Sequence, residues 1–165
     1  MGKKKINGEI MVYGKYGLVI PDGEEVRELD GTQVKFFKFV KAKEKTVIYI
    51  PAYSFEHSQI RKPVSKKVAN EMLKIMFKKK RVMKQDGKKW IKRYKELTER
   101  VKNADPLQLA EIFAELVAYN RVKPLSFGER SIFDSIKDIL CEEIAYVLNK
   151  KEEELRLQLE KLLEV

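Results

Sequence analysis

The period of the apolar residues changes near Pro63, and this change constrains the fold more than any other feature of the sequence. Before it, apolar residues alternate with polar ones or form short runs between turn residues, a pattern that indicates β-strands. After it, they recur at the spacing of an amphipathic helix, with about 3.6 residues per turn. The sequence therefore predicts an α+β chain, with a β domain over residues 1–64 and an all-helical domain over residues 65–165.

Short strands separated by tight turns are expected throughout the first domain. The Asp30-Gly31 pair is a strong signal for a two-residue hairpin, and Pro21-Asp22-Gly23 predicts the end of a strand. Five strands are expected, at residues 9–13, 17–20, 26–29, 34–40 and 46–50. This pattern predicts a small SH3- or Tudor-like β-barrel, a fold that usually binds a partner but does not by itself identify one.

Four to five helices are expected in the second domain. The apolar stripes of the first two are Val68, Met72, Ile75 and Met76, and Trp90, Tyr94, Leu97 and Val101. Asp105-Pro106 supplies an N-cap followed by a proline at the first helical position. The segment from Ser126 to Glu129 is a capping box that opens a long helix. Leucines in the tail predict a fifth helix or a helix that docks on a partner.

The positive charge of the chain is concentrated in one segment. The chain has 35 Lys and Arg against 25 Asp and Glu, for a formal net charge of +10. Residues 67–103 alone carry 14 basic and 4 acidic side chains, which equals the excess of the whole chain. Such a concentration favours a polyanionic partner, nucleic acid first and an acidic membrane surface second. The alternative is a solvated, lysine-rich surface of the kind common in heat-adapted proteins.

Several classes of function are disfavoured by residues that the sequence lacks. The single cysteine (Cys141) and single histidine (His57) cannot build a disulfide framework or a Cys/His zinc site. We find no glycine-rich phosphate loop, no apolar run of about 20 residues and no secretory signal. We therefore expect no catalytic residues, cofactor, metal, small-molecule substrate or membrane anchor, and a cytoplasmic protein associated with the nucleoid.

The only tryptophan lies inside the most basic stretch, at an expected helix start. Lysine and arginine bind phosphates by releasing counterions, and a helix N-terminus attracts the same anions. An aromatic ring beside such a patch can stack on a base or wedge into a minor-groove step. Trp90 also shares a stripe with Tyr94 and Leu97, so it could instead be a core residue. Periodicity alone favours the core.

Several segments of the chain resemble the CarD/CdnL family of bacterial transcription regulators. In the helical half these are Trp90–Leu97, Leu109–Leu116 and Leu125–Arg130. In the β half, residues 8–17 resemble the opening of the family's barrel, which is shared with transcription-repair coupling factors, and residues 46–51 resemble its closing strand. The resemblance covers nearly the whole chain in the same order, and it is most specific around Trp90 and the Leu125–Arg130 turn.

This resemblance implies a DNA-binding role for the helical domain. The domain would sit on double-stranded promoter DNA at the upstream edge of the melted region, with Trp90 as a wedge in the minor groove. The resemblance thus shifts Trp90 from a core residue to an exposed one. The residues then expected to bind DNA are Lys88, Lys89, Trp90, Lys92, Arg93, Lys95 and Arg130.

The resemblance also implies a protein partner for the barrel, the RNA polymerase β subunit, bound by pairing along a strand edge. Arg27 occupies a place where the family often has an arginine that contacts polymerase, and Tyr49 stands where other members have a second arginine. The hypothesis is a monomeric, non-enzymatic regulator that stabilises the open promoter complex. The alternative is a polymerase-independent nucleoid-associated or RNA-binding structural protein. A transcription-repair adaptor is a third possibility.

Overall fold

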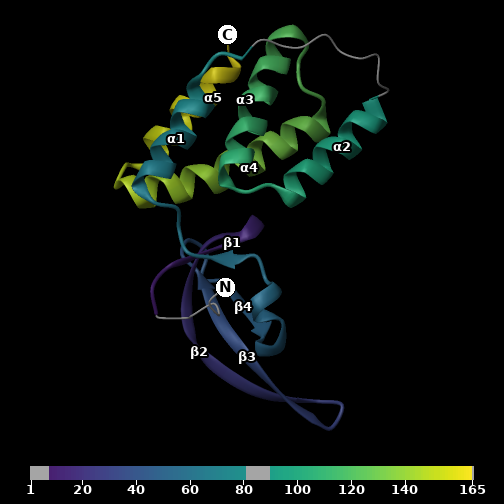
Figure 1. Ribbon diagram of the computed structural model, residues 1–165, viewed down its shortest axis with the longest axis vertical. Helices are drawn as coiled ribbons and strands as arrows, with labels where there is room; N and C mark the ends of the chain where they lie inside the picture. Colours follow the sequence, from purple (N-terminus) through teal and green to yellow (C-terminus); the bar gives the residue numbers. More distant parts are fainter. Residues whose placement is uncertain (1–7, 81–89, 165) are drawn as a thin grey trace. The chain divides into compact units, whose positions relative to one another are not determined.

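The chain forms two compact units, residues 1–63 and 64–165, in a computed structural model that describes residues 8–80 and 90–164 (Figure 1). The first unit is built on an antiparallel sheet and the second on helices. The predicted α+β fold class is therefore confirmed. The division follows Pro63, next to the expected boundary, because the alternating pattern ends there and a helix cap begins at Ser65.

The first unit is a five-stranded antiparallel sheet with the order β4-β3-β2-β1-β5. Its strands are β1 (Met11–Tyr13), β2 (Gly17–Leu29), β3 (Thr32–Lys41), β4 (Val47–Pro51) and β5 (Ile60–Arg61). Figure 1 shows β2 and β3 extending as a long two-stranded ribbon. The turn between them has left-handed backbone at Asp30 (φ 49°) and Gly31 (φ 78°), as expected for the predicted Asp-Gly hairpin.

Two details of the sheet differ from the sequence prediction. Residues 17–20 and 26–29 belong to one continuous strand, β2, because Pro21-Asp22-Gly23 forms an irregularity in the pairing with β3 rather than a turn. Gly23 has φ 90°, a conformation that glycine adopts without strain, and it allows the strand to continue past the one extra residue. The two-residue strand β5 is too short to produce a periodic signal and was not predicted.

The core of the sheet unit lies on one face of the strands. Phe39 is fully buried, and its ring stacks against Phe55 at 6.2 Å between centroids with an interplanar angle of 9°. Phe37 meets the same ring edge-on at 5.0 Å. Phe55 comes from the 3-10 segment η2 (Ala52–His57), which crosses this face. One aromatic residue from outside the sheet thus closes the core of a small domain.

The second unit contains five α-helices within the described residues. They are α1 (Lys66–Phe77), α2 (Trp90–Asn103), α3 (Pro106–Val122), α4 (Phe127–Leu148) and α5 (Glu152–Glu160), followed by the 3-10 turn η3 (Lys161–Leu163). Both predicted helix starts form reciprocal capping boxes. Asp105 accepts the backbone N–H of Gln108 at 2.8 Å, and Ser126 accepts that of Glu129 at 3.2 Å.

The helical core is centred on α3 and α4. The rings of Phe113 and Phe133, both fully buried, stack at 4.7 Å between centroids. The predicted stripe of α2 contributes Leu97, which is buried, and Val101, which packs against the same core. Its first member, Trp90, begins α2, but its side chain lies outside the described part of the chain.

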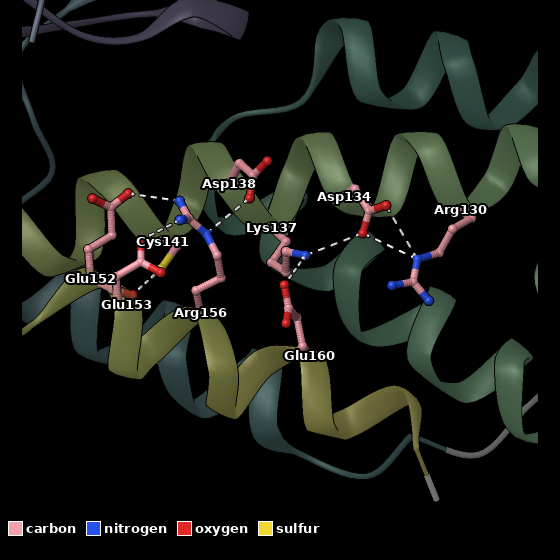
Figure 2. A network of polar contacts seen from close by, with 9 residues as sticks. All are labelled: Arg130, Asp134, Lys137, Asp138, Cys141, Glu152, Glu153, Arg156 and Glu160. Carbon is pink, nitrogen blue, oxygen red and sulfur yellow. Dashed lines mark hydrogen bonds and ion pairs between the residues drawn. The ribbon is translucent and has the colours of Figure 1, made fainter. Parts of the chain in front are cut away.

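A polar network joins α4 to α5 (Figure 2). Arg156 forms ion pairs with three carboxylates, those of Asp138, Glu152 and Glu153. Burial lowers the pKa of Arg156, but the neighbouring carboxylates raise it by more, so that the net pKa lies above its usual value. The ion pair between Arg156 and Asp138 connects the short α5 to the long α4. The thiol of Cys141, which is buried, donates to the backbone oxygen of Glu152 at 3.3 Å.

Candidate nucleic-acid and protein interfaces

The predicted wedge residue occupies the first position of α2. Lys92 follows in the same helical turn. The side chains of Trp90 and Lys92, and the whole of Lys88 and Lys89, lie outside the described residues. The exposure of Trp90 and the phosphate contacts of these lysines therefore stay predictions. The structure instead describes the contacts that hold the next residues of α2 against α3 and α4.

Arg93 makes two of these contacts. Its guanidinium lies 3.0 Å from Oε2 of Glu129, a residue that is only 4 % exposed. The other carboxylate oxygen of Glu129 accepts the backbone N–H of Ser126 at 3.1 Å, which completes the capping box of α4. The Arg93 guanidinium also lies 5.5 Å from the ring of Tyr119 on α3. Arg93 thus ties the start of α2 to the start of α4, a role that the sequence analysis did not anticipate.

A second contact fixes the same two helix starts. A Cβ atom on Gly128 would lie 2.7 Å from Cε2 of Tyr94, closer than any real Cβ contact. Glycine at this position therefore lets the aromatic ring of α2 approach the backbone of α4. Together with the ion pair between Arg93 and Glu129, this contact joins the first part of α2 to the start of α4. We call it the α2–α4 joint, defined by Arg93, Tyr94, Gly128 and Glu129.

Two predicted phosphate-binding residues are presented beside this joint. Lys95 is exposed and has no ion-pair partner among the described residues. Arg130 is half exposed, and its Nε lies 3.2 and 3.3 Å from the two carboxylate oxygens of Asp134 (Figure 2). Its two terminal nitrogens have no partner in residues 8–80 and 90–164. Arg130 is therefore held in place by one nitrogen and keeps donors for an anion.

Other cations of the basic segment are already neutralised within the unit. Arg100 donates two hydrogen bonds to Glu115, at 2.7 and 2.9 Å. The bond to this carboxylate raises the pKa of Arg100 above its usual value. Lys80 forms an ion pair with Glu111. Neutralisation by α3 carboxylates is not visible in the sequence, because the partners lie 15 and 31 residues apart along the chain.

The structure also brings together the two residues predicted to contact a protein partner. The guanidinium carbon of Arg27 lies 4.2 Å from the centroid of the Tyr49 ring, a cation–π contact between β2 and β4. Glu25 accepts two hydrogen bonds from Arg27, at 3.2 and 3.0 Å, and a long one of 3.5 Å from the Tyr49 hydroxyl. The sequence analysis missed Glu25, which positions both side chains.

This trio belongs to the face of the sheet opposite the Phe39 core. Residues that pair directly across antiparallel strands share a face, and the register places Arg27 opposite Val34 and Tyr49 opposite Lys38. Val34 and Lys38 are four residues apart on β3 and therefore share one face, whereas Phe39 points to the other. Exposed apolar side chains on the same face are Ile20, Leu29 and Val47. We call this the outer sheet face. Exposed apolar residues that share a face with a fixed arginine are typical of a protein-binding surface.

Two further properties concern the described residues as a whole. No group of His, Cys, Asp or Glu side chains within them is arranged to hold a metal ion. None of their helices has the length and apolar character needed to cross a membrane.

The fold and these surfaces define a class of two-unit protein. A small sheet with exposed apolar residues on one face precedes a helical domain that carries accessible cations beside the α2–α4 joint. The family model described as CarD, C-terminal domain, matches residues 71–160, more than half of the chain. The chain therefore belongs to the CarD family. This is a family of non-enzymatic transcription factors known to interact with RNA polymerase, so the protein is a transcription-associated regulator.

Proposed function

We propose that the protein binds the RNA polymerase β subunit through its sheet unit and upstream promoter DNA through the start of α2, and thereby stabilises the open promoter complex. The observation that carries this proposal is the α2–α4 joint, because it attaches α2 to the start of α4 through Arg93 and Tyr94 and leaves Lys95 and Arg130 accessible. In this proposal the protein acts as a monomer in the nucleoid.

The DNA contact uses few specific interactions. Lys92, Lys95 and Arg130 would neutralise phosphates, which contributes affinity without reading sequence. Trp90, the first residue of α2, would pack into a minor-groove step at the upstream edge of the bubble. A wedge that fits a step already unstacked avoids an unstacking cost of a few kcal/mol, so it favours melted over closed DNA.

The polymerase contact uses the sheet. β4 is an edge strand, and an edge strand can accept a further strand from a partner. Beside it, the outer sheet face presents Arg27, held by Glu25 and stacked on Tyr49. An arginine fixed in one orientation loses little conformational entropy on binding, which favours specific recognition of a protein surface.

Holding two partners at once explains how modest contacts have a regulatory effect. Tethering to polymerase raises the effective concentration of the helical unit at the promoter. The protein shifts the equilibrium toward the open complex by the difference between its binding free energies for the open and closed states. A difference of about 1.4 kcal/mol changes the ratio of open to closed complex tenfold.

The test is the lifetime of the open complex on a defined promoter. We expect the wild-type protein to lengthen it and both Trp90→Ala and Arg27→Glu to abolish the effect. Arg27→Glu should also lose retention on polymerase, whereas Trp90→Ala should keep it. If Trp90→Ala retains full activity but unfolds at a much lower temperature, Trp90 is a core residue and the wedge is wrong. If the wild-type protein binds any duplex with a steep salt dependence but never polymerase, the nucleoid-associated alternative is correct.

A further inference from the structure

An aromatic side chain stands almost fully in solvent at the corner between α3 and α4. Phe127, the first residue of α4, is 94 % exposed, and Val122, the last residue of α3, is 66 % exposed. By contrast, Phe113 and Phe133 in the same unit are fully buried. Phenylalanine is usually buried in proteins, so an exposed ring and an exposed valine at the two ends of one interhelical connection indicate a contact surface. We call residues 121–127 together with Arg130 the α3–α4 corner.

The backbone that carries Phe127 is held firmly. It lies directly after the N-cap Ser126 and two residues before Glu129, whose reciprocal hydrogen bonds form the capping box. Glu129 is buried and paired with Arg93, and Gly128 lies under the Tyr94 ring. The exposed ring is thus mounted on the α2–α4 joint, which also carries the first turn of α2. A rigid mount reduces the entropy lost when the ring packs against a partner.

The charge around this ring favours a phosphate-bearing partner. Lys123 is exposed and has no ion-pair partner among the residues that the structure describes. Arg130 keeps two free terminal nitrogens. Of the nearby carboxylates, Glu129 is neutralised by Arg93 and Asp134 is shared by Arg130 and Lys137.

We propose that the α3–α4 corner makes a second aromatic contact with DNA, separate from that of Trp90. The Phe127 ring packs against an unstacked base or a deoxyribose, while Lys123 and Arg130 bind the flanking phosphates. An exposed aromatic ring with one cation four residues before it and another three residues after it matches a nucleic acid, which offers flat apolar bases and anionic phosphates, better than a purely apolar protein surface. This inference rests on the proposed function for the presence of a melted DNA edge at the joint.

The experiment measures binding of the full-length protein to two DNA probes by fluorescence anisotropy. One probe is a fully paired duplex, and the other is the same sequence with a forked, unpaired end. We expect Phe127→Ala to weaken binding to the forked probe by roughly tenfold and to the paired duplex by less than about twofold. Phe127→Tyr should retain binding because it keeps an aromatic ring. The matched control is Phe77→Ala, the same change at an exposed position on α1, which should leave both affinities unchanged.

The salt dependence of the DNA affinity distinguishes the contribution of the Phe127 ring from that of the cations. Phe127→Ala should leave the slope of log affinity against log salt unchanged, whereas Lys123→Gln should reduce it by about 0.9, because only the lysine releases a counterion. Thermal unfolding of Phe127→Ala should match that of the wild type, since the ring is exposed.

The outcomes distinguish this inference from the proposed function. If Trp90→Ala loses forked-DNA binding but Phe127→Ala binds like the wild type, the corner does not contact DNA and the proposed function stands. If the wild type binds neither probe, the proposed DNA contact is itself wrong. If Phe127→Ala keeps DNA binding but loses retention on polymerase, the corner contacts protein instead, and our inference is overturned.

Discussion

Each of the two units contains an arginine that is paired with a glutamate and lies against a tyrosine ring, but the two trios differ in burial. In the sheet unit, Arg27 is paired with Glu25 and stacked on Tyr49 at 4.2 Å. In the helical unit, Arg93 is paired with Glu129 and lies 5.5 Å from the Tyr119 ring. The side chain of Glu25 is 40 % exposed, whereas that of Glu129 is 6 % exposed.

Burial of the carboxylate decides what each arginine does. Glu25 is two residues from Arg27 on one strand and stays solvated if the pair breaks, so the pair contributes about 0–1 kcal/mol to stability. Glu129 is held in the fold by its capping bonds, and without Arg93 its charge would be buried and unpaired. The exposed trio thus leaves its arginine accessible to solvent, and the buried trio holds two helices together.

Replacing Arg93 should have the largest effect on stability. Arg93→Met keeps much of the apolar stem but leaves Glu129 without a counter-charge, so we expect the free energy of unfolding to fall by about 3 kcal/mol. Denaturant unfolding of the full chain measures this value. The matched change in the exposed trio, Arg27→Met, should cost less than about 1 kcal/mol. Equal losses in the two variants would contradict the distinction between the trios.

Adding one methyl group to the joint should have the next largest effect. Gly128→Ala places a Cβ 2.7 Å from the Tyr94 ring, and we expect it to destabilise the helical unit by about 1–3 kcal/mol through overpacking. The double variant with Tyr94→Ala checks the cause by a double-mutant cycle. In the Tyr94→Ala background, Gly128→Ala should lower the free energy of unfolding by much less than it does in the wild type. Additive losses would show that the ring does not constrain this position.

Replacing Glu25 should change binding rather than folding. Glu25→Gln removes the charge that holds Arg27, and we expect the free energy of unfolding to change by less than about 1 kcal/mol. Retention on polymerase should fall severalfold, because the arginine is no longer fixed over Tyr49. The control is Glu56→Gln, at an exposed position on η2. Full retention by Glu25→Gln would show that the carboxylate does not position the arginine for binding.

Replacing the accessible cations beside the joint, Lys95 and Arg130, should have the smallest effect on stability, within about 0.5 kcal/mol. Lys95→Gln and Arg130→Gln should each reduce the slope of log DNA affinity against log salt by about 0.9, because each removes one phosphate contact. Arg100→Gln is the comparison, since Arg100 is already neutralised by Glu115. It should leave the slope unchanged. If Arg100→Gln reduces the slope as much as Lys95→Gln does, then an ion pair within the protein does not prevent a cation from binding DNA phosphates.

Much of the local structure was predictable because its causes are local. The Asp30-Gly31 hairpin and the capping boxes at Asp105 and Ser126 depend on residues at most three positions apart, and all are present. The ends of β2 were not predictable in the same way. Pro21-Asp22-Gly23 is compatible with a turn or a bulge, and pairing with β3 selects the bulge.

The candidate sites were predictable in composition but not in arrangement. Arg27 and Tyr49 were expected from the family resemblance, and their contact with Glu25 was not, because that contact depends on where β2 and β4 lie in the sheet. Arg93 was expected to bind phosphate like Lys95. Its nearest charge in the structure is Glu129, 36 residues away along the chain.

The sequence by itself determined the two-part architecture, the starts of α3 and α4 and the concentration of positive charge, since periodicity, capping and charge counts act over a few residues. Only the tertiary structure decided which cations are available. Carboxylates from other helices neutralise Arg93 and Arg100, while Lys95 and part of Arg130 are left to face solvent. Neutralisation depends on distances between side chains that are far apart in the sequence, and packing of the helices alone sets those distances.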